Sequence, residues 1–485
     1  MAEKKGVATD SLKLSIAQII SLAVSMLNVM LLSRFRTVEE YGTYSQMIMV
    51  SAIIYTFFSS GFSQCINYFI ASEKSDAKRA TFIKTYYAIL TISGLIGGIL
   101  SVALLPSITR YFNNEALWKY SYFMLVYPIA RILNDGVDRF FIIYKKTNQL
   151  MFFKIRYGLS SLVVAVLAVL LKWNFDQYLI VFTLVELIFA ILVYYFIFRV
   201  THVVPLGFNT TMCKNILAFA IPMALAGLIS IINKELDKFI IGGVTNTETL
   251  ALYTNAAKEL PVTVFTTSIA TVVMPHVVKN IQNDKNKEAI NIWNASIKLT
   301  SLIMCFFCVA FFTYAPQVIS VLYSDKYLPS VNIFRIYLLT ELFRLTYYGM
   351  VLNAQKKTKL ILYSSIGSML TNLALDILLF KMMGITGPAW ATVISVAAMN
   401  LFQLMYTKHI LKVSFFEIYP VKYILKCLLL NCVLGIFFYY IQQYVFNKID
   451  FNQNMMTVFL GCIWGAVYLF IIRKKALSIW RQLNS

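Results

Sequence analysis

The sequence has little charge. Only 13% of its 485 residues are Asp, Glu, Lys or Arg, about half the usual share in soluble proteins, whereas 59% are hydrophobic. A soluble fold of this composition would lack the polar surface that water requires. The hydrophobic content suffices for about 14 membrane spans of about 20 residues each. We therefore predict an all-α polytopic membrane protein with essentially no domain outside the membrane.

Groups that carry catalytic and metal chemistry are also scarce. The three histidines, His202, His276 and His409, are isolated from one another, so a paired-histidine site of the acyltransferase type is not expected. The seven cysteines are scattered, and only Cys305 and Cys308 show a CxxC spacing. These two lie in mid-span, where core packing is favoured over metal or redox chemistry. We expect no catalytic residue, metal, cofactor or disulfide framework.

Basic residues gather on one side of the expected membrane. If the N-terminus lies inside, most Lys and Arg fall in cytoplasmic segments, and this positive-inside bias places both termini in the cytoplasm. Topology therefore explains the net charge of +21, and no nucleic-acid partner is expected. The first apolar stretch is long enough to be a retained helix instead of a cleaved signal. The expected spans are 12–33, 43–71, 84–108, 117–143, 152–171, 177–198, 212–233, 248–277, 295–322, 329–353, 359–381, 386–407, 421–441 and 453–472.

The chain contains an internal repeat. Lys145-Lys146-Thr147, between two expected helices, recurs as Lys356-Lys357-Thr358, 211 residues later. Tyr44 and Tyr253 are 209 residues apart in similar contexts. A near-constant offset indicates one hydrophobic unit used twice. Because each unit has six expected spans, both enter the membrane from the same side and the repeat is parallel.

The repeat predicts three parts. Residues 1–200 form an N-terminal six-helix bundle and residues 201–410 a second one. Residues 411–485 add two helices, 13 and 14, with a cytoplasmic tail. No segment between spans is long enough for a catalytic domain. Duplicated membrane halves are how many transporters build a site that can face either side.

Several ionisable side chains lie at membrane depth, where a charge costs at least about 2.5–3.5 kcal/mol unless it faces a partner or a cavity. Spacing allows some to pair along their helices: Arg131 with Asp135, and Glu341 with Arg344. Lys234 and Lys238 share a helix face, where they would repel unless a neighbouring carboxylate intervenes, or would extend toward the interface. The others within or at the ends of spans include Arg34, Glu186, Lys258, Glu259, Arg335 and Asp376.

Lys258 is the hardest of these charges to explain by packing. It lies well inside the expected helix 248–277, and Glu259 projects about 100° away from it. A cation at this depth favours a water-filled cavity and an anionic ligand. Arg34 and Lys238 occupy matching places in the two halves, so we expect the three to form a cationic patch. Two or three such donors would compensate the charge of a diphosphate headgroup.

A sugar attached to such a headgroup would need hydroxyl, amide and aromatic side chains around it. Candidates of the right kind occur in the second helix of each half. With 30 tyrosines in the chain, membrane-interface anchoring is the alternative interpretation for the aromatic ones. The candidates are Tyr44, Gln64, Asn67, Tyr253 and Asn255.

The chain resembles a known family over essentially its whole length, including the number of expected spans, and local motifs carry the resemblance. The chain is similar to the Wzx-type, or oligosaccharide-flippase, branch of the multidrug/oligosaccharidyl-lipid/polysaccharide exporter superfamily. The motifs are Leu32-Ser33-Arg34-Phe35, Glu40-Tyr41-Gly42-Thr43-Tyr44, Gly61-Phe62-Ser63, Asp237-Lys238-Phe239-Ile240-Ile241-Gly242, Ala251-Leu252-Tyr253, Ala257-Lys258 and Pro261.

The resemblance implies two six-helix bundles around a central cationic cavity, plus two C-terminal helices, in a bacterial cytoplasmic membrane. It implies alternating-access transfer of an undecaprenyl-pyrophosphate-linked oligosaccharide to the outer leaflet for O-antigen, capsule or exopolysaccharide assembly. Besides membrane lipids, expected partners are a coupling ion (proton or sodium) and a polymerase or export complex. By position, Arg34, Lys238 and Lys258 would contact the pyrophosphate. Further cavity cations would be Lys234, Arg131, Arg335 and Arg344, and ion-coupling candidates are Glu186, Glu259 and Asp376.

Other functions are less consistent with the sequence. A drug or cation antiporter of the same superfamily would favour an acidic cavity. A polymerase would have one large external loop, and a glycosyltransferase would need acidic metal ligands, whereas the close pair Asp135 and Asp138 lies among arginines. The dense arginines of lipid II flippases are missing from the first two helices, which disfavours a peptidoglycan precursor.

Overall fold

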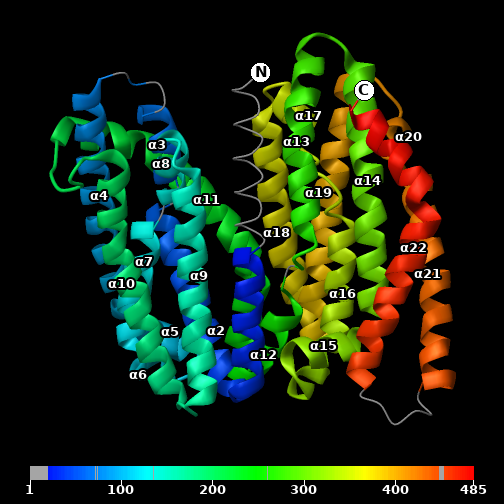
Figure 1. Ribbon diagram of the computed structural model, residues 1–485, viewed down its shortest axis with the longest axis horizontal. Helices are drawn as coiled ribbons and strands as arrows, with labels where there is room; N and C mark the ends of the chain where they lie inside the picture. Colours follow the sequence, from blue (N-terminus) through cyan, green and yellow to red (C-terminus); the bar gives the residue numbers. More distant parts are fainter. Residues whose placement is uncertain are drawn as a thin grey trace. The chain divides into compact units, whose positions relative to one another are not determined.

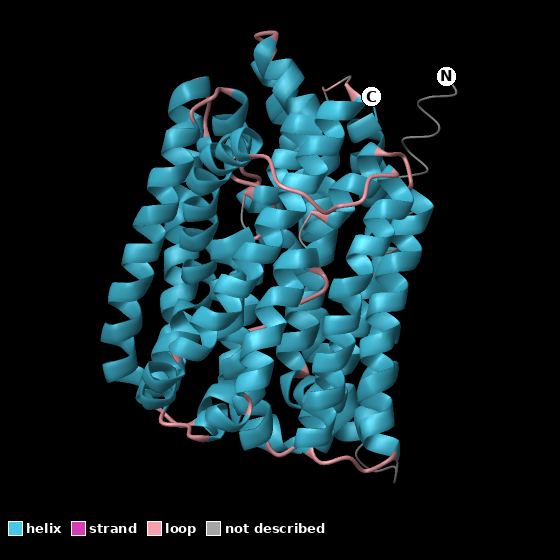
Figure 2. Ribbon diagram, turned by 90° about the vertical axis from the view of Figure 1, so that its left-hand side faces the viewer, coloured by secondary structure: helices cyan, strands magenta, loops and turns pink. Residues whose placement is uncertain are grey.

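The computed structural model describes residues 20–59, 61–70, 73, 75–134, 136–258, 260–446 and 453–484. Every regular element among these residues is a helix (Figure 2). Within the described part of the chain, eight segments are long and apolar enough to cross a membrane. The expectation of an all-α multi-pass membrane protein is confirmed. Each of the fourteen expected spans overlaps a helix or a broken pair of helices, and the count of fourteen crossings stays a prediction.

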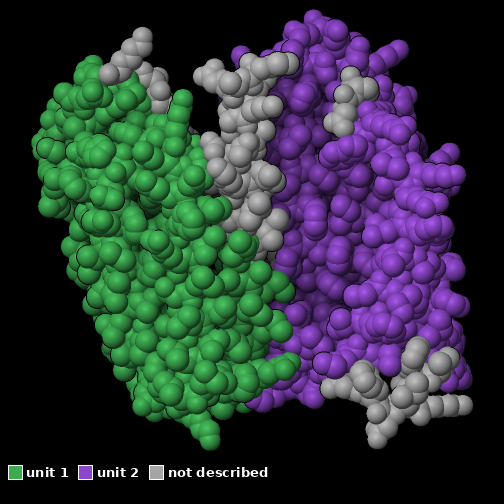
Figure 3. Space-filling model, in the orientation of Figure 1, with its two compact units in different colours: residues 1–251 green, residues 252–485 purple. Residues whose placement is uncertain are grey.

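The chain forms two compact units, Met1–Ala251 and Leu252–Ser485, coloured green and purple in Figure 3. α11 packs on α2, α3, α4 and α5 within unit 1, so the first compact unit extends past residue 200. The predicted boundaries at 200 and 410 describe the repeat and stay predictions. The helices of unit 1 (Figure 1) are Ile20–Phe35, α2 (Val38–Ser59), α3 (Phe62–Ile70), α4 (Asp76–Ala103), α5 (Leu105–Phe112), α6 (Ala116–Lys119), α7 (Ser121–Asn134), α8 (Val137–Ile143), α9 (Thr147–Leu170), α10 (Phe175–Thr201) and α11 (Thr210–Val244).

Unit 2 begins within α12 (Thr247–Ala256). The most extensive helix–helix contact in this unit is between α18 and α19, which pack on each other as a helical hairpin. The helices that follow α12 are α13 (Thr263–Gln282), α14 (Asn286–Thr313), α15 (Ala315–Tyr323), η1 (Asp325–Ser330), α16 (Val331–Leu342), α17 (Met350–Ala354), α18 (Thr358–Met383), η2 (Gly384–Thr386), α19 (Gly387–Leu411), α20 (Phe415–Ile418), α21 (Val421–Ile441), η3 (Gln442–Phe446) and α22 (Gln453–Asn484).

The repeat is visible in the helices themselves. α4 and α14 each contain 28 residues and begin 210 residues apart, and α9 and α18 begin 211 residues apart. Non-glycine residues with positive φ also recur where corresponding helices end, which shows that the same turns were kept in both halves. The matched pairs are Asn113 and Ser324, Lys145 and Lys356, and His202 and Lys412.

Short sequence signals explain where helices begin. The Asn174 side chain accepts a hydrogen bond from the Gln177 N–H, and the Gln177 side-chain oxygen accepts one from the Asn174 N–H, which is a capping box at the start of α10. Asn209 caps α11 by accepting from the Met212 N–H at 2.8 Å. Prolines occupy the first turns of α5 and α15, where a missing N–H is harmless.

Six expected spans are broken helices, and two of them are interrupted only at a single residue, Leu104 between α4 and α5 and Tyr314 between α14 and α15. Gly61 (φ 90°) separates α2 from α3, and Gly136 (φ 77°) separates α7 from α8. Residues 257–262, before and around Pro261, separate α12 from α13, and residues 343–349 separate α16 from α17. The breaks at 136 and 343–349 lie at matching points of the two halves. Pro128, Pro222 and Pro275 lie inside continuous helices.

The break at Pro261 corrects one expectation. Lys258 was predicted to lie inside a helix, but it lies in the non-helical segment between α12 and α13. Proline lacks an N–H and disfavours helical geometry in the residue before it, so the helix ends upstream. Non-helical backbone at membrane depth is tolerated where it is buried in protein or lines a water-filled cavity.

Aromatic packing holds α3, α4 and α8 around the break at Gly136. Tyr86 stacks on Phe82 with ring centroids 5.5 Å apart and meets the edge of Phe140 at 5.6 Å. A Cβ at Gly136 would lie 2.5 Å from the Tyr86 hydroxyl. The left-handed backbone and this close approach both require glycine there.

Gly98→Ala is expected to lower the melting temperature of the purified protein. A Cβ at Gly98 of α4 would lie 2.4 Å from the Leu125 carbonyl oxygen of α7, so the two helices must separate, at a cost of about 1–3 kcal/mol. Gly367→Ala in α18 is the matched control, because nothing lies within 4 Å of its Cβ position. Equal melting temperatures for the two variants would contradict the close packing of α4 on α7.

Candidate functional site

A buried carboxylate in unit 1 joins three helices. Glu186, in the middle of α10, has a side chain only 2% exposed, and its Oε1 lies 3.8 Å from Arg131 Nη2 in the last turn of α7. Tyr157 of α9 donates its hydroxyl proton to the same Oε1 at 2.7 Å. A charge at this depth needs such partners. The ion pair and the tyrosine hydrogen bond therefore connect α7, α9 and α10 where these helices pack together.

The Arg131 guanidinium also lies against two aromatic rings. It is 4.8 Å from the Tyr127 ring centroid and 5.7 Å from that of Tyr157, distances at which cation–π attraction is significant. Tyr127 stacks on Phe123 with centroids 4.9 Å apart. Tyr44 of α2 lies 6.4 Å from Phe123. Tyr44, a candidate for sugar binding, and Arg131, a candidate cavity cation, thus lie at one aromatic cluster.

Arg131 has a described partner that spacing along its helix did not predict. Sequence spacing predicted pairing with Asp135, which lies outside the described residues, whereas Glu186 is the described partner. Arg131 Nε and Glu186 Oε2 are buried and have no hydrogen-bond partner among the described residues. Buried polar atoms of this kind normally bind water or another polar group.

Arg36 is a buried arginine that the sequence patterns did not indicate. Arg36 is 9% exposed and donates from Nη1 to the Trp173 carbonyl at 2.7 Å. Its guanidinium lies 5.7 Å from the Tyr178 ring, and Tyr178 stacks on Phe182 at 5.8 Å. The signals that could have found it were an arginine two residues after Arg34 and an aromatic pair four residues apart on one helix face.

The three predicted diphosphate contacts occupy different settings. Arg34 is exposed in the last turn of helix Ile20–Phe35, and Lys258 is exposed at the α12–α13 break. Lys238, near the end of α11, is 13% exposed and pairs with Glu235 at 2.7 Å, so a carboxylate does intervene between it and Lys234. Because Arg34 and Lys238 belong to unit 1 and Lys258 to unit 2, their convergence stays a prediction.

The sugar candidates of the second half are buried. Tyr253 is fully buried in α12, with its hydroxyl oxygen 3.2 Å from that of Tyr337 in α16, and Asn255 is 1% exposed. Tyr44, by contrast, is half-buried. The side chains of Gln64 and Asn67 lie outside the described part of the structure. The role of these residues stays a prediction.

In unit 2, polar side chains stabilise the break between α16 and α17. Asn400 Nδ2 donates to the Phe343 carbonyl at 2.6 Å, and the Thr300 hydroxyl donates to the Leu345 carbonyl at 2.7 Å. These bonds satisfy carbonyls that the broken helix has freed. Arg344, within the break, pairs with Glu341 at 3.7 Å, as the spacing predicted. The segment is thus held in a defined conformation next to two charges.

Arg335 and Asp376, two further charges predicted at membrane depth, lie in helices of unit 2. Arg335 of α16 donates from Nε to the Phe312 carbonyl at 3.3 Å. Asp376 of α18 is fully buried, and Asn372 Nδ2 lies 3.4 Å from its Oδ1. Glu259 lies outside the described residues. Where the structure is described, no group of three or more His, Cys, Asp or Glu side chains could hold a metal ion.

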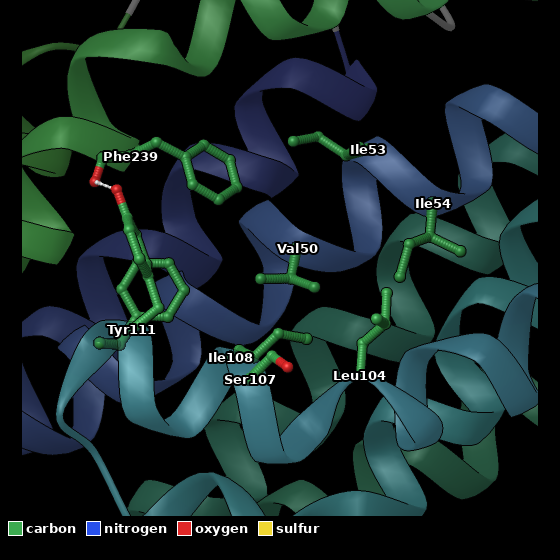
Figure 4. A pocket seen from close by; sticks show the side chains of 9 residues that line it. Val50, Ile53, Ile54, Leu104, Ser107, Ile108, Tyr111 and Phe239 are labelled. Carbon is green, nitrogen blue, oxygen red and sulfur yellow. Dashed lines mark hydrogen bonds between the residues drawn. The ribbon is translucent and has the colours of Figure 1, made fainter.

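A pocket of about 420 Å³ in unit 1 is unsuited to an anion (Figure 4). Its polar side chains are those of Ser107 and Tyr111, and the Tyr111 hydroxyl donates to the Phe239 carbonyl at 3.0 Å. No cation lines it. The other lining residues are Val50, Ile53, Ile54, Leu104, Ile108, Phe112 and Phe239.

Known proteins resemble this chain in sequence and in fold. A probable lipid II flippase MurJ from Rhizobium tropici is 26% identical over 205 residues, which is 40% of this chain and 38% of that protein's length. A lipid II flippase MurJ in an inward closed conformation superposes with a TM-score of 0.71 at 18% identity, covering 95% of this chain and 98% of the other. An inward-facing multidrug resistance MATE family transporter of the MOP superfamily gives a TM-score of 0.63 at 14% identity, covering 83% and 98%.

The structural likenesses show a fold shared with these transporters over nearly the whole chain. The resemblance to a polysaccharide family that was inferred from local motifs is confirmed by a family profile. The profile of the family described as polysaccharide biosynthesis protein matches residues 31–332. That range covers more than half of the 485 residues and includes Arg34, Arg131, Glu186, Lys238 and Lys258. The chain is therefore a multi-pass membrane protein of the polysaccharide biosynthesis protein family.

Proposed function

We propose that this protein is a flippase that moves a polyprenyl-diphosphate-linked oligosaccharide from the inner to the outer leaflet of the bacterial cytoplasmic membrane. The observation that carries the proposal is the family match over residues 31–332. The fold shared with a lipid II flippase supports transfer of a lipid-linked precursor. The relatives are named as flippases and transporters, so the activity is transport and the chain is not an enzyme.

The diphosphate would contact Arg34, Lys238 and Lys258. Arg34 and Lys258 are exposed, and both lie near helix ends, where a change of conformation alters their surroundings most. A lysine or arginine at membrane depth binds a phosphate more strongly than in water, because the local dielectric constant is low. The charged headgroup would thereby cross the membrane without entering lipid.

The ion-coupling candidates would respond to a proton or sodium gradient. Glu186 is bound by Arg131 and Tyr157, so a change in its charge would loosen the contact between α7, α9 and α10. Asp376 lies beside Asn372 in α18. Each could link ion binding to movement of its own helices, and a polymerase or export complex would receive the product.

Deletion of the gene is expected to trap the lipid-linked oligosaccharide on the cytoplasmic side. An impermeant reagent that oxidises or binds sugars, added to intact spheroplasts, would label far less of the lipid-linked pool in the deletion strain than in wild type. The chain supplied from a plasmid should restore labelling. Unchanged labelling in the deletion strain would exclude the proposed flippase activity.

A drug or cation antiporter is the second candidate, because MATE transporters share the fold. Arg131 and Arg344 each have a carboxylate partner. Because these charges are paired, they favour neither the basic cavity expected of a flippase nor the acidic cavity expected of a cation antiporter. Efflux of a cationic dye from cells that overproduce the protein separates the two. The flippase proposal predicts no efflux above that of the empty vector.

A further inference from the structure

A basic pocket lies at the C-terminal end of α19 in unit 2. It has a volume of about 410 Å³, and its charged or titratable lining residues are Lys408, His409 and Lys412. Met405 and Val413 complete the lining. None of the candidate substrate-binding or ion-coupling residues lines the pocket, and the charge distribution of the chain places it on the predicted cytoplasmic side.

Backbone geometry builds the pocket. Lys412 has a left-handed conformation (φ 54°), and its N–H caps α19 by donating to the Lys408 carbonyl. The chain turns sharply there, so that Val413 lies beside the last turn of the helix and closes one side of the pocket. Attraction to the helix dipole explains cations in the last turn, but it does not explain a cavity between them.

The charge of the lining favours an anionic ligand. Two lysines and one imidazole can all donate hydrogen bonds to phosphate oxygens. None of the lining residues is acidic, and the nearest acidic residue along the chain, Glu417, is outside the lining. A phosphate group is the common biological anion that would take three such donors.

The surface above the pocket identifies the source of the phosphate. On the face of α19 that leads to the pocket, Phe402, Met405 and Tyr406 are exposed, and the rings of Phe402 and Tyr406 are 4.7 Å apart. An aromatic and apolar surface that ends in lysines is typical of a helix passing from the hydrocarbon region into the lipid headgroups. A free phosphate ion would not contact that apolar surface, whereas the acyl chains of a lipid would cover it.

We propose that the basic pocket at Lys408, His409 and Lys412 binds the headgroup phosphate of an anionic phospholipid of the cytoplasmic leaflet. The acyl chains lie along Phe402, Met405 and Tyr406. The bound lipid anchors the end of α19 to the membrane surface, where the chain continues toward α20 and α21. The inference does not depend on the proposed transport function, because it is tested by binding alone.

The test uses the full-length protein in phosphatidylcholine nanodiscs that contain pyrene-labelled phosphatidylglycerol, with tryptophan-to-pyrene energy transfer as the measure of binding. Lys408→Ala/Lys412→Ala is expected to weaken binding roughly 10- to 30-fold, from about 1 kcal/mol for each lysine near an anionic surface. Lys422→Ala/Lys426→Ala is the matched control: these lysines of α21 are also exposed and four residues apart, but neither lines the pocket. The control should bind like wild type.

A variant that keeps the charge separates binding from folding. Lys408→Arg/Lys412→Arg should retain phosphatidylglycerol binding, because guanidinium groups also bind phosphate. The proposal is overturned if the two alanine variants bind equally well, or if labelled phosphatidylcholine binds as strongly as phosphatidylglycerol. Displacement of the labelled lipid by millimolar inorganic phosphate would also overturn it, since the site would then be one for free anions.

Discussion

Lys258→Ala is expected to abolish export of the surface polysaccharide while the protein still inserts into the membrane. Lys258 is exposed in the break between α12 and α13, so the substitution removes no buried side chain. If its ammonium group contacts the diphosphate, the loss of one charged partner weakens binding by about 2–5 kcal/mol. The amount of polymer at the cell surface, normalised to the amount of protein in the membrane, measures the effect.

Two further variants make this result specific. Lys258→Arg keeps the positive charge and should preserve much of the export. Lys279→Ala removes another exposed lysine, from α13, and should leave export unchanged. Normal export by Lys258→Ala would remove Lys258 from the binding site, and equal loss in Lys279→Ala would assign the effect to total charge.

Glu186→Leu is expected to destabilise the protein strongly. It would leave the Arg131 guanidinium at membrane depth without its described carboxylate partner. Breaking a fully buried ion pair costs about 3–5 kcal/mol, and because the Arg131 side chain is 33% exposed we expect about 2–3 kcal/mol. The melting temperature in detergent, followed by monodispersity on size exclusion, measures the loss.

The double variant Arg131→Leu/Glu186→Leu provides the sharpest control. Replacement of both partners by apolar side chains leaves no buried charge, so the double variant should be more stable than Glu186→Leu alone. Tyr157→Phe removes one neutral donor to Glu186 and should cost about 1 kcal/mol. A double variant less stable than Glu186→Leu would show that the ion pair is not what stabilises these helices.

Sequence periodicity and spacing predicted much of the fold. Every expected span overlaps one or more helices, because a run of about 20 apolar residues favours a helix that crosses the membrane. The offset seen in Lys145 and Lys356 recurs in their left-handed backbone conformations. Local spacing also predicted the Glu341–Arg344 pair, since residues three apart share a helix face.

The site was harder to predict. Glu186 and Arg131 are 55 positions apart, and Tyr157 lies between them, so no local pattern in the sequence joins the three. Asp135 was the nearer partner by spacing, yet the packing of α7 on α10 brings Glu186 within reach. Lys258 was assigned to a helix because the hydrophobic window ran through Pro261 without interruption.

By itself the sequence determined that this chain enters the membrane, that its backbone is helical, and that one unit is used twice. These properties follow from the free energy of transferring apolar residues into lipid and from local backbone preferences, which depend on each residue and its neighbours along the chain. Only the tertiary structure decided which charges meet, which helices are broken, and where lysines surround a pocket. Those outcomes depend on which helix faces pack together, and side chains far apart in sequence decide that packing.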